Sequence, residues 1–191
     1  CYPEEVRDPV RIAEVLNRVI EKARRGSAPA QINVPRDYWT QVIDIELPQV
    51  IEVERSPGGE AAIAKAAALL SEASFPVILN GAGAVLSGAI ETSVSLAERL
   101  GAPVCCNYQH NDAFPGSHPL AAGPLGYNGS KAAMELISRA DVVLALGTRL
   151  NPFSTLPGYG IDYWPKDARL IQVDINADRI GLTKKVDVAI Q

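Results

Sequence analysis

Cysteine, histidine and methionine are scarce in this chain of 191 residues. It has three cysteines, two histidines and one methionine, Met134. Neither a C-x-x-C nor an H-E-x-x-H pattern occurs, and the adjacent Cys105 and Cys106 would point to opposite faces of a strand. A zinc site and a disulfide framework are therefore not expected. We predict reduced thiols in a cytoplasmic protein.

Long runs of basic or apolar residues are also missing. No basic run exceeds Arg24–Arg25 or Lys184–Lys185, and the formal net charge is -4. This argues against nucleic acid and against an anionic membrane as partners. No apolar stretch approaches the roughly 18 residues that a membrane-spanning helix needs, and the N-terminus does not resemble a secretion signal. Because the chain also lacks an initiator methionine, we expect a fragment of a longer protein.

Apolar residues are plentiful at 47%, against 21% charged residues, so a packed core is expected. An apolar spacing of three or four predicts a helix within residues 3–25, with Asp8-Pro9 as its start signal and Gly26 as its stop. A short strand is expected over residues 28–35. The stretch that follows has two prolines and no helical period, which indicates a linker.

Helices and strands alternate from residue 58 onward. Helices are predicted over residues 59–74, 87–101 and 130–140, with Ser87 and Ser130 as N-caps and Gly101 as a stop. Strands are predicted over residues 76–83, 103–108, 141–148, 169–175 and 186–191. The Gly- and Pro-rich residues 111–130 are expected to form a long loop.

The predicted strands are apolar throughout, which is typical of a parallel sheet covered on both faces. With right-handed crossovers, the fold class is α/β: a Rossmann-like, doubly wound parallel sheet with helices on both faces. For the five strands of this sheet we predict the order 2-1-3-4-5.

The stretch "VILNGAGAVLSG", residues 77–88, has the pattern of a strand, a glycine turn and a helix. Gly81 and Gly83 would let the backbone turn sharply and approach a phosphate. However, a G-x-G-x-x-G motif would need glycine where Leu86 stands, and Asn107 occupies the place of the acidic residue typical of NAD sites. The sequence leaves two interpretations open: a nucleotide site, or glycines that only permit a tight turn.

Further glycine and polar residues follow other predicted strands and would meet at the same edge of the sheet. They are Gly126, Asn128, Gly147, Thr148, Arg149, Asp174 and Asn176. Together they favour a ligand site at that edge. Individually, Arg149 could instead pair with a carboxylate, and Asp174 could cap a turn.

Three segments, residues 77–83, 123–153 and 169–181, resemble the central domain of thiamine-diphosphate-dependent enzymes of the acetohydroxyacid synthase and pyruvate oxidase group. Residues 28–39 resemble the end of the pyrimidine-binding domain of that family, and the resemblance covers essentially the whole chain. Residues 32–41 and 147–166 are most similar to the sulfoacetaldehyde acetyltransferases. These convert sulfoacetaldehyde and phosphate to acetyl phosphate and sulfite.

The resemblance implies a division into three parts. Residues 1–36 would be the last helix and strand of the N-terminal pyrimidine-binding domain, 37–56 a linker, and 57–191 the central Rossmann-like domain. Thiamine diphosphate and magnesium would be bound by the full-length parent, between flanking pyrimidine- and diphosphate-binding domains. No residue of this chain would be catalytic, because the activating glutamate and the G-D-G…N-N motif lie elsewhere. The parent would be a homodimer or homotetramer.

In some relatives the central domain holds FAD or ADP. By motif position, such a nucleotide would contact Gly81, Ala82, Gly83, Gly126, Asn128, Gly147, Thr148, Arg149, Asp174 and Asn176. FAD-binding relatives carry an R-F-D-D-R-like segment where this chain has "TRLNPFS", so FAD is not expected. An acetolactate synthase-like FAD/ADP-binding domain is the alternative, and a sirtuin-like NAD-dependent deacylase is a more remote one.

Aromatic residues outside the predicted elements are candidates for contacts with other domains or subunits. They are Tyr38, Trp39, Tyr159, Tyr163 and Trp164. The alternative is that they cover the core beneath long loops.

Overall fold

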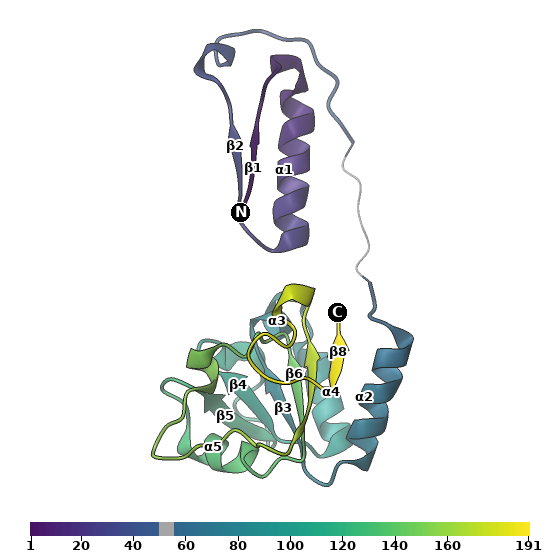
Figure 1. The fold of residues 1–191 in the computed structure, drawn as a ribbon, viewed down its shortest axis with the longest axis vertical. Coiled ribbons are helices and arrows are strands. Elements are labelled where there is room, and N and C mark those ends of the chain that lie inside the picture. The colour runs from purple at the N-terminus through teal and green to yellow at the C-terminus, as the bar shows by residue number, and fades with distance from the viewer. Residues whose placement is uncertain (50–55) are drawn as a thin grey trace. The chain divides into compact units, whose positions relative to one another are not determined.

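The computed structural model describes residues 1–49 and 56–191 (Figure 1). They form two compact units, the second of which begins at Ser56. Part of the predicted linker, residues 50–55, lies outside the described residues. Residues 39–49 contain neither helix nor strand. The assignment of residues 1–36, 37–56 and 57–191 to family domains stays a prediction.

The first unit is a strand–helix–strand motif whose two strands pair in parallel. Its elements, in chain order, are β1 (Tyr2–Glu5), η1 (Pro9–Arg11), α1 (Ile12–Gly26), β2 (Ala30–Asn33) and η2 (Arg36–Tyr38). Val6, Val15 and Val19 form its buried centre. The strand predicted within residues 28–35 is confirmed as β2.

The helix predicted within residues 3–25 begins later than expected. The side chain of Asp8 does accept a hydrogen bond from the Val10 N–H at 3.1 Å, but it starts the 3-10 turn that leads into α1. The helix ends at Gly26 as predicted, and Ser27 takes the left-handed conformation. Residues 2–5 are a strand because they pair with β2, and such a short, mixed-polarity strand leaves no periodic signal in the sequence.

A six-stranded, fully parallel sheet forms the centre of the second unit. Its strands are β3 (Pro76–Asn80), β4 (Val104–Asn107), β5 (Ala121–Leu125), β6 (Val142–Leu146), β7 (Arg169–Val173) and β8 (Val188–Ile190). The spatial order is β5-β4-β3-β6-β7-β8. This is the strand order of dinucleotide-binding Rossmann folds, and the predicted α/β class is confirmed. The five expected strands keep the predicted relative order 2-1-3-4-5, and β5 extends the sheet beyond β4.

Helices cover the sheet on both sides (Figure 1). They are α2 (Glu60–Glu72), α3 (Ala82–Leu86), α4 (Ile90–Leu100) and α5 (Lys131–Ile137), with the 3-10 turns η3 (Asn111–Ala113), η4 (Pro152–Thr155) and η5 (Ala177–Arg179). Side chains of the strands alternate between two buried clusters. Val77 and Leu79 join the cluster that contains α5, whereas Ile78 joins the one that contains residues of α2 and α4. The alternation explains why the strands read as continuous apolar runs.

The prediction of one long loop over residues 111–130 is wrong, because β5 lies within it. This strand contains Gly123 and Pro124, which disfavour strand structure in a sequence prediction. It forms the edge of the sheet beside β4, where a proline costs no hydrogen bond on the open side.

The helix predicted over residues 87–101 is also corrected at its start. Ser87 is no N-cap of α4; it ends the short helix α3, and its hydroxyl donates to the Gly83 carbonyl at 2.7 Å. Gly88 then takes a left-handed φ of 69°, which breaks the chain before α4. The other two signals are confirmed: Gly101 ends α4 in the left-handed conformation, and Ser130 caps α5 by accepting from the Ala133 N–H.

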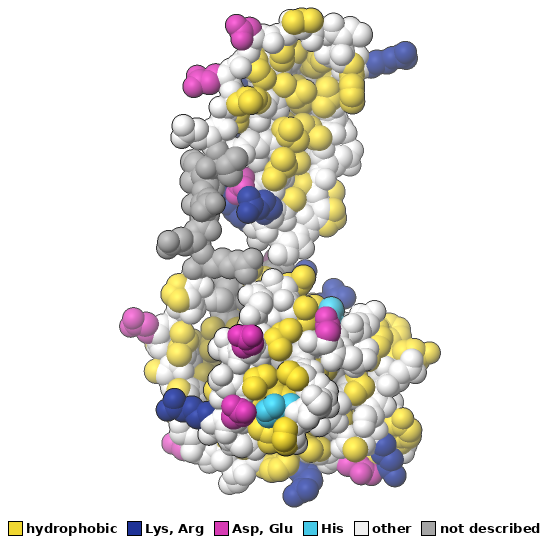
Figure 2. Space-filling model, turned by 180° about the vertical axis from the view of Figure 1, so that it is seen from behind, with side chains coloured by type: hydrophobic (Ala, Val, Ile, Leu, Met, Phe, Trp, Pro, Cys, Tyr) yellow, Lys and Arg dark blue, Asp and Glu magenta, His cyan; other side chains and the backbone are white. Residues whose placement is uncertain are grey.

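Several apolar side chains stay on the surface of the first unit. Hydrophobic side chains gather over its visible face in Figure 2. On α1, Leu16 and Ile20 are 43% and 47% exposed, one helical turn apart. None of the helices in the described parts of the chain combines the length and apolar character needed to span a bilayer.

Candidate functional site

The carboxyl ends of β3 and β6 bring four of the predicted site residues together. The Gly81 N–H donates to the Leu146 carbonyl, and the Gly83 N–H donates to the Gly147 carbonyl, each at 2.9 Å. Thr148 follows directly. The turn after β3 and the turn after β6 therefore touch through their backbones.

This close approach explains the glycines. A Cβ atom on Gly83 would lie 2.5 Å from the Gly147 Cα, and one on Gly81 would lie 2.6 Å from the Gly147 carbonyl oxygen. Gly147 also has a left-handed φ of 61°. The space left by the missing side chains is filled by the neighbouring turn of the same chain. These contacts account for the tight turn, which is the second interpretation left open by the sequence.

Thr148 is 1% exposed and belongs to a buried hydrogen-bond network. Its hydroxyl accepts from the Asn107 amide at 2.9 Å and from the Leu150 N–H at 3.2 Å. Asn107, which stands where a dinucleotide site would have an acid, thus binds the loop after β6. The buried polar side chains of Asn107 and Thr148 are thus hydrogen-bonded to each other.

Asp174 and Asn176 are committed to turns in their own loop after β7. The Asp174 carboxylate accepts from the Asn176 N–H at 2.9 Å, and the Asn176 side chain accepts from the Asp178 N–H at 2.9 Å. Asp174 is buried. The capping role that the sequence left open for Asp174 is the one the geometry supports.

The remaining predicted residues lie apart from this cluster or at its surface. Gly126 packs against the backbone of Phe153 and Ser154 in η4, with a left-handed φ of 84°. Asn128 is exposed and also left-handed, and Arg149 is exposed. Ala82 is the first residue of α3 and half-buried. The nucleotide-binding role of the predicted residues stays a prediction.

Nucleophile and metal chemistry find little support among the described residues. Burial raises the pKa of both adjacent thiols, to about 11 for Cys106, so neither is a thiolate near neutral pH. Both histidines lie beside carboxylates (Figure 2): His110 is 3.6 Å from Asp112 and His118 is 3.3 Å from Glu98. Within residues 1–49 and 56–191, no group of three His, Cys, Asp or Glu side chains could hold a metal.

Comparison with known proteins decides the family. Residues 63–191 match the family described as "Thiamine pyrophosphate enzyme, central domain". The chain belongs to this family. The match confirms the resemblance drawn from the sequence, and it leaves the sirtuin-like alternative without support.

The chain is similar over its whole length to proteins named sulfoacetaldehyde acetyltransferase, and less similar to an acetolactate synthase. It is 80% identical over 190 residues to the "Probable sulfoacetaldehyde acetyltransferase" of Rhizobium meliloti (strain 1021). It is 77% identical over 190 residues to the "Sulfoacetaldehyde acetyltransferase" of Roseovarius nubinhibens. The identity to the "Probable acetolactate synthase large subunit" of Methanocaldococcus jannaschii is 34% over 194 residues. The alignments cover 100%, 100% and 97% of this chain but 32% of each relative, so the chain spans about a third of their length.

A solved structure shares the fold. Benzoylformate decarboxylase from Polynucleobacter necessarius superposes with a TM-score of 0.79 at 21% identity. The superposition covers 98% of this chain and 35% of that one. At this identity the likeness concerns the fold of the thiamine pyrophosphate enzyme central domain, not its chemistry.

Sequence reasoning missed two buried polar residues of this central domain. The Gln172 amide donates to the Thr148 carbonyl at 3.1 Å, and its oxygen accepts from the Gly181 N–H at 2.9 Å. The Asn80 amide donates to the Ser93 hydroxyl at 2.8 Å. Asn80 is the one polar residue of β3, and Gln172 stands between apolar residues of β7, so a polar residue inside an apolar run was the available signal.

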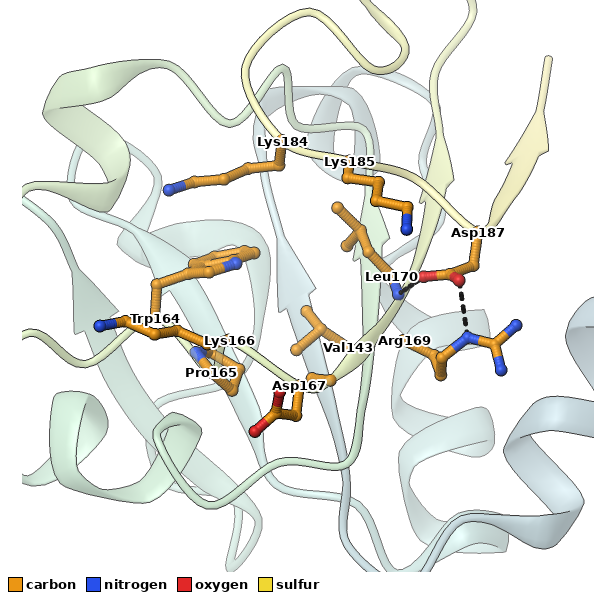
Figure 3. Close-up of a pocket in the computed structure, with 11 residues that line it drawn as sticks. Val143, Trp164, Pro165, Lys166, Asp167, Arg169, Leu170, Lys184, Lys185 and Asp187 are labelled. Carbon is orange, nitrogen blue, oxygen red and sulfur yellow. Dashed lines mark hydrogen bonds and ion pairs between the residues drawn. The ribbon is translucent and has the colours of Figure 1, made fainter.

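The central domain also has a hollow at the opposite edge of its sheet (Figure 3). Its volume is about 320 Å³. It lies at the amino ends of β6 and β7, between the segments that lead into β7 and β8. The lining residues are Val143, Trp164, Pro165, Lys166, Asp167, Ala168, Arg169, Leu170, Lys184, Lys185 and Asp187. None of them belongs to the predicted nucleotide site.

Proposed function

We propose that the full-length protein is a sulfoacetaldehyde acetyltransferase and that this chain supplies its central, non-catalytic part. In the reaction, sulfoacetaldehyde and phosphate give acetyl phosphate and sulfite, with thiamine diphosphate as cofactor and magnesium as metal. The observation that carries the proposal is the identity of 80% and 77% to relatives with that name, sustained over 190 residues.

The residues of this chain do not by themselves fit thiamine diphosphate or its metal. The described residues hold no cluster of metal ligands, and the sequence contains neither G-D-G nor N-N. When bound elsewhere in the parent, the cofactor would supply the carbanion chemistry. No step of the reaction is assigned to a residue of this chain.

The contribution of this chain is a rigid centre. The backbone contacts between Gly83 and Gly147 and the buried network around Thr148 fix the loops at the carboxyl edge of the sheet. Buried, mutually satisfied polar groups favour one arrangement of loops over others. A centre of this kind would hold the flanking domains in position.

We further propose that residues 1–36 complete a pyrimidine-binding domain, that 37–56 link it to the central domain, and that 57–191 are most of that domain. A two-stranded sheet with one helix is marginal on its own, and α1 leaves Leu16 and Ile20 exposed. Both features suit the end of a larger domain. A cytoplasmic homodimer or homotetramer belongs to the same proposal, with Trp39 and Tyr159, 74% and 66% exposed, as candidate contact residues.

FAD or ADP is not part of the proposed function. Thr148, Asp174 and Asn176, three of the polar residues that would contact it, already bind groups of this chain. The proposed acetyl transfer has no redox step that would need a flavin.

Sulfite release tests the proposal. The full-length protein, supplied with thiamine diphosphate, magnesium and phosphate, is expected to release sulfite from sulfoacetaldehyde and to form acetyl phosphate in equal amount. Leaving out phosphate is the control and should abolish acetyl phosphate.

Pyruvate separates the proposal from its alternative. Formation of acetolactate from pyruvate, with no sulfite from sulfoacetaldehyde, would move the parent to the acetolactate synthase branch.

A further inference from the structure

We propose that the hollow at the amino edge of β6 and β7 binds a small organic anion that carries a phosphate or sulfonate group on an apolar body. The proposal rests on the lining of the cavity alone and does not depend on the reaction proposed above.

The lining of the cavity has more basic than acidic side chains. Four basic side chains line the cavity, Lys166, Arg169, Lys184 and Lys185, against the two carboxylates of Asp167 and Asp187. The chain as a whole has a net charge of -4. A concave basic surface on an acidic chain concentrates anions locally.

One of the two carboxylates is already neutralised. Asp187 accepts from the Arg169 Nε at 2.6 Å and from the Leu170 N–H at 2.9 Å, so both of its oxygens are occupied. These contacts hold the pKa of Asp187 below its ordinary value, with the Leu170 N–H as the main cause. In Figure 3 the Asp167 carboxylate points away from both Lys184 and Lys185. In the same view the Lys184 side chain extends over Trp164, and the Lys185 ammonium extends toward Asp187, whose oxygens are already bound.

The lysines are adjacent in sequence and are held differently. The Lys184 ammonium lies 4.9 Å from the centre of the Trp164 ring, a cation–π contact that fixes its position at the wall. Lys185 is exposed and lies on the same loop before β8. Lys166, by contrast, pairs with Asp162 at 3.2 Å. Lys184 and Lys185 are thus the two ammonium groups of the lining that form no ion pair with a carboxylate of the described residues.

The apolar part of the lining defines the rest of the ligand. Val143, Leu170 and Pro165 are buried residues that border the cavity, next to the ring of Trp164. Small-molecule sites combine such a surface with a few charged groups, and about 320 Å³ is within their usual range. An ammonium group binds a phosphate or sulfonate as a point charge, without the planar fork that arginine offers to a carboxylate.

Titration calorimetry on the full-length protein tests the proposal, with phenyl phosphate as the probe. Phenyl phosphate is expected to bind, and to bind more weakly as salt is raised. Benzenesulfonate should bind at the same site, whereas inorganic phosphate and ethanesulfonate should bind less well because they lack the aromatic body.

Variants assign the binding to this cavity. K184Q/K185Q should weaken phenyl phosphate binding about tenfold or more, since hydrogen bonds to charged groups are lost. K184R/K185R should retain most of it. Lys22→Gln is the matched control: its ammonium also lies over an aromatic ring, 5.7 Å from the centre of Tyr2, but it does not line the cavity. It should leave binding unchanged.

A second measurement does not depend on the variants. Hydrogen exchange of peptides spanning residues 183–188 should slow when phenyl phosphate is added to the wild-type protein. The proposal is overturned if phenyl phosphate does not bind at millimolar concentration. It is also overturned if binding is the same in K184Q/K185Q, or if removing thiamine diphosphate abolishes binding while those peptides exchange as before.

Discussion

The two edges of the central sheet differ in how the chain uses them. At the carboxyl edge, the turns after β3 and β6 meet backbone to backbone, and the polar side chains there bind one another. At the amino edge, the segments before β7 and β8 leave a hollow lined by basic side chains (Figure 3). The glycines that suggest a nucleotide thus lie where two turns of the chain contact each other. The cavity lies where the sequence offered only Trp164 and the pair Lys184–Lys185 as notable residues.

The difference shows that a glycine pattern alone does not report a ligand. Gly81 and Gly83 are required, but the atoms that require them belong to Gly147 and Thr148. Close approach of two turns and close approach of a phosphate impose the same demand on the sequence. Which of the two applies depends on what occupies the space beside the glycine. Substitutions at both edges of the sheet test the comparison.

The largest effect is expected at the carboxyl edge, for Gly147→Ala. Its Cβ would meet the Ala84 nitrogen at 2.6 Å in a left-handed conformation, so the cost should be about 3 kcal/mol from strain and overlap together. Gly101→Ala is the matched control, with the same φ of 61° and no atom within 4 Å, and should cost about 1 kcal/mol. Hydrogen exchange of β3 and β6 in the full-length protein measures both. If the two alanine variants lost equal stability, steric overlap between the turns after β3 and β6 would be contradicted.

A smaller loss is expected for Thr148→Val. The substitution deletes the hydroxyl that accepts hydrogen bonds from the Asn107 amide and the Leu150 N–H. Its loss should lower the free energy of unfolding by about 1–3 kcal/mol. Thr148→Ser keeps the hydroxyl and removes a methyl group, so it should cost less, about 0.8 kcal/mol. Hydrogen exchange around β4 and β6 again provides the measurement. A Val variant as stable as the Ser variant would mean that the network contributes nothing.

At the amino edge, Asp187→Asn should cost about 1 kcal/mol at pH 7, because it weakens the bonds to Arg169 and the Leu170 N–H. The folded-state pKa of Asp187 is lowered, so its contribution is present above the ordinary carboxyl pKa and is lost as pH falls through the lower folded value. Denaturant unfolding at pH 7 and pH 3 should therefore show a smaller difference between variant and wild type at pH 3. Glu135→Gln, which breaks the exposed pair with Lys131, should change stability by less than about 0.5 kcal/mol.

The smallest effect at neutral pH is expected for Tyr163→Phe, directly before Trp164 of the cavity wall. The Tyr163 hydroxyl is buried and has no hydrogen-bond partner within 3.5 Å among the described residues, so its removal should not lower stability at neutral pH. Burial raises the pKa of Tyr163 to about 12, above its ordinary value of 10.0. The wild type should therefore lose stability as pH rises from 10 toward 12, and the variant should lose about 1 kcal/mol less at pH 11. If both proteins lost stability equally between pH 10 and pH 12, the raised pKa of Tyr163 would be contradicted.

The sequence predicted the fold class, the order of five strands and the caps at Gly101 and Ser130, because buried strands and helix ends have strong local signals. It missed β1 and β5, whose residues become strands only through pairing with distant partners. For the candidate site, it located Gly81, Gly83, Gly147 and Thr148 at one edge of the sheet. It could not show that these residues contact one another, because the space beside a glycine is set by the tertiary structure.

The measurement that tests the account most directly combines absorbance and activity on the purified full-length protein. We predict sulfite release from sulfoacetaldehyde with thiamine diphosphate, magnesium and phosphate as the only additions, and no absorbance in the flavin band. A stoichiometric flavin in the purified protein, or sulfite release that requires added FAD or ADP, would contradict the proposal that this central domain works without a nucleotide.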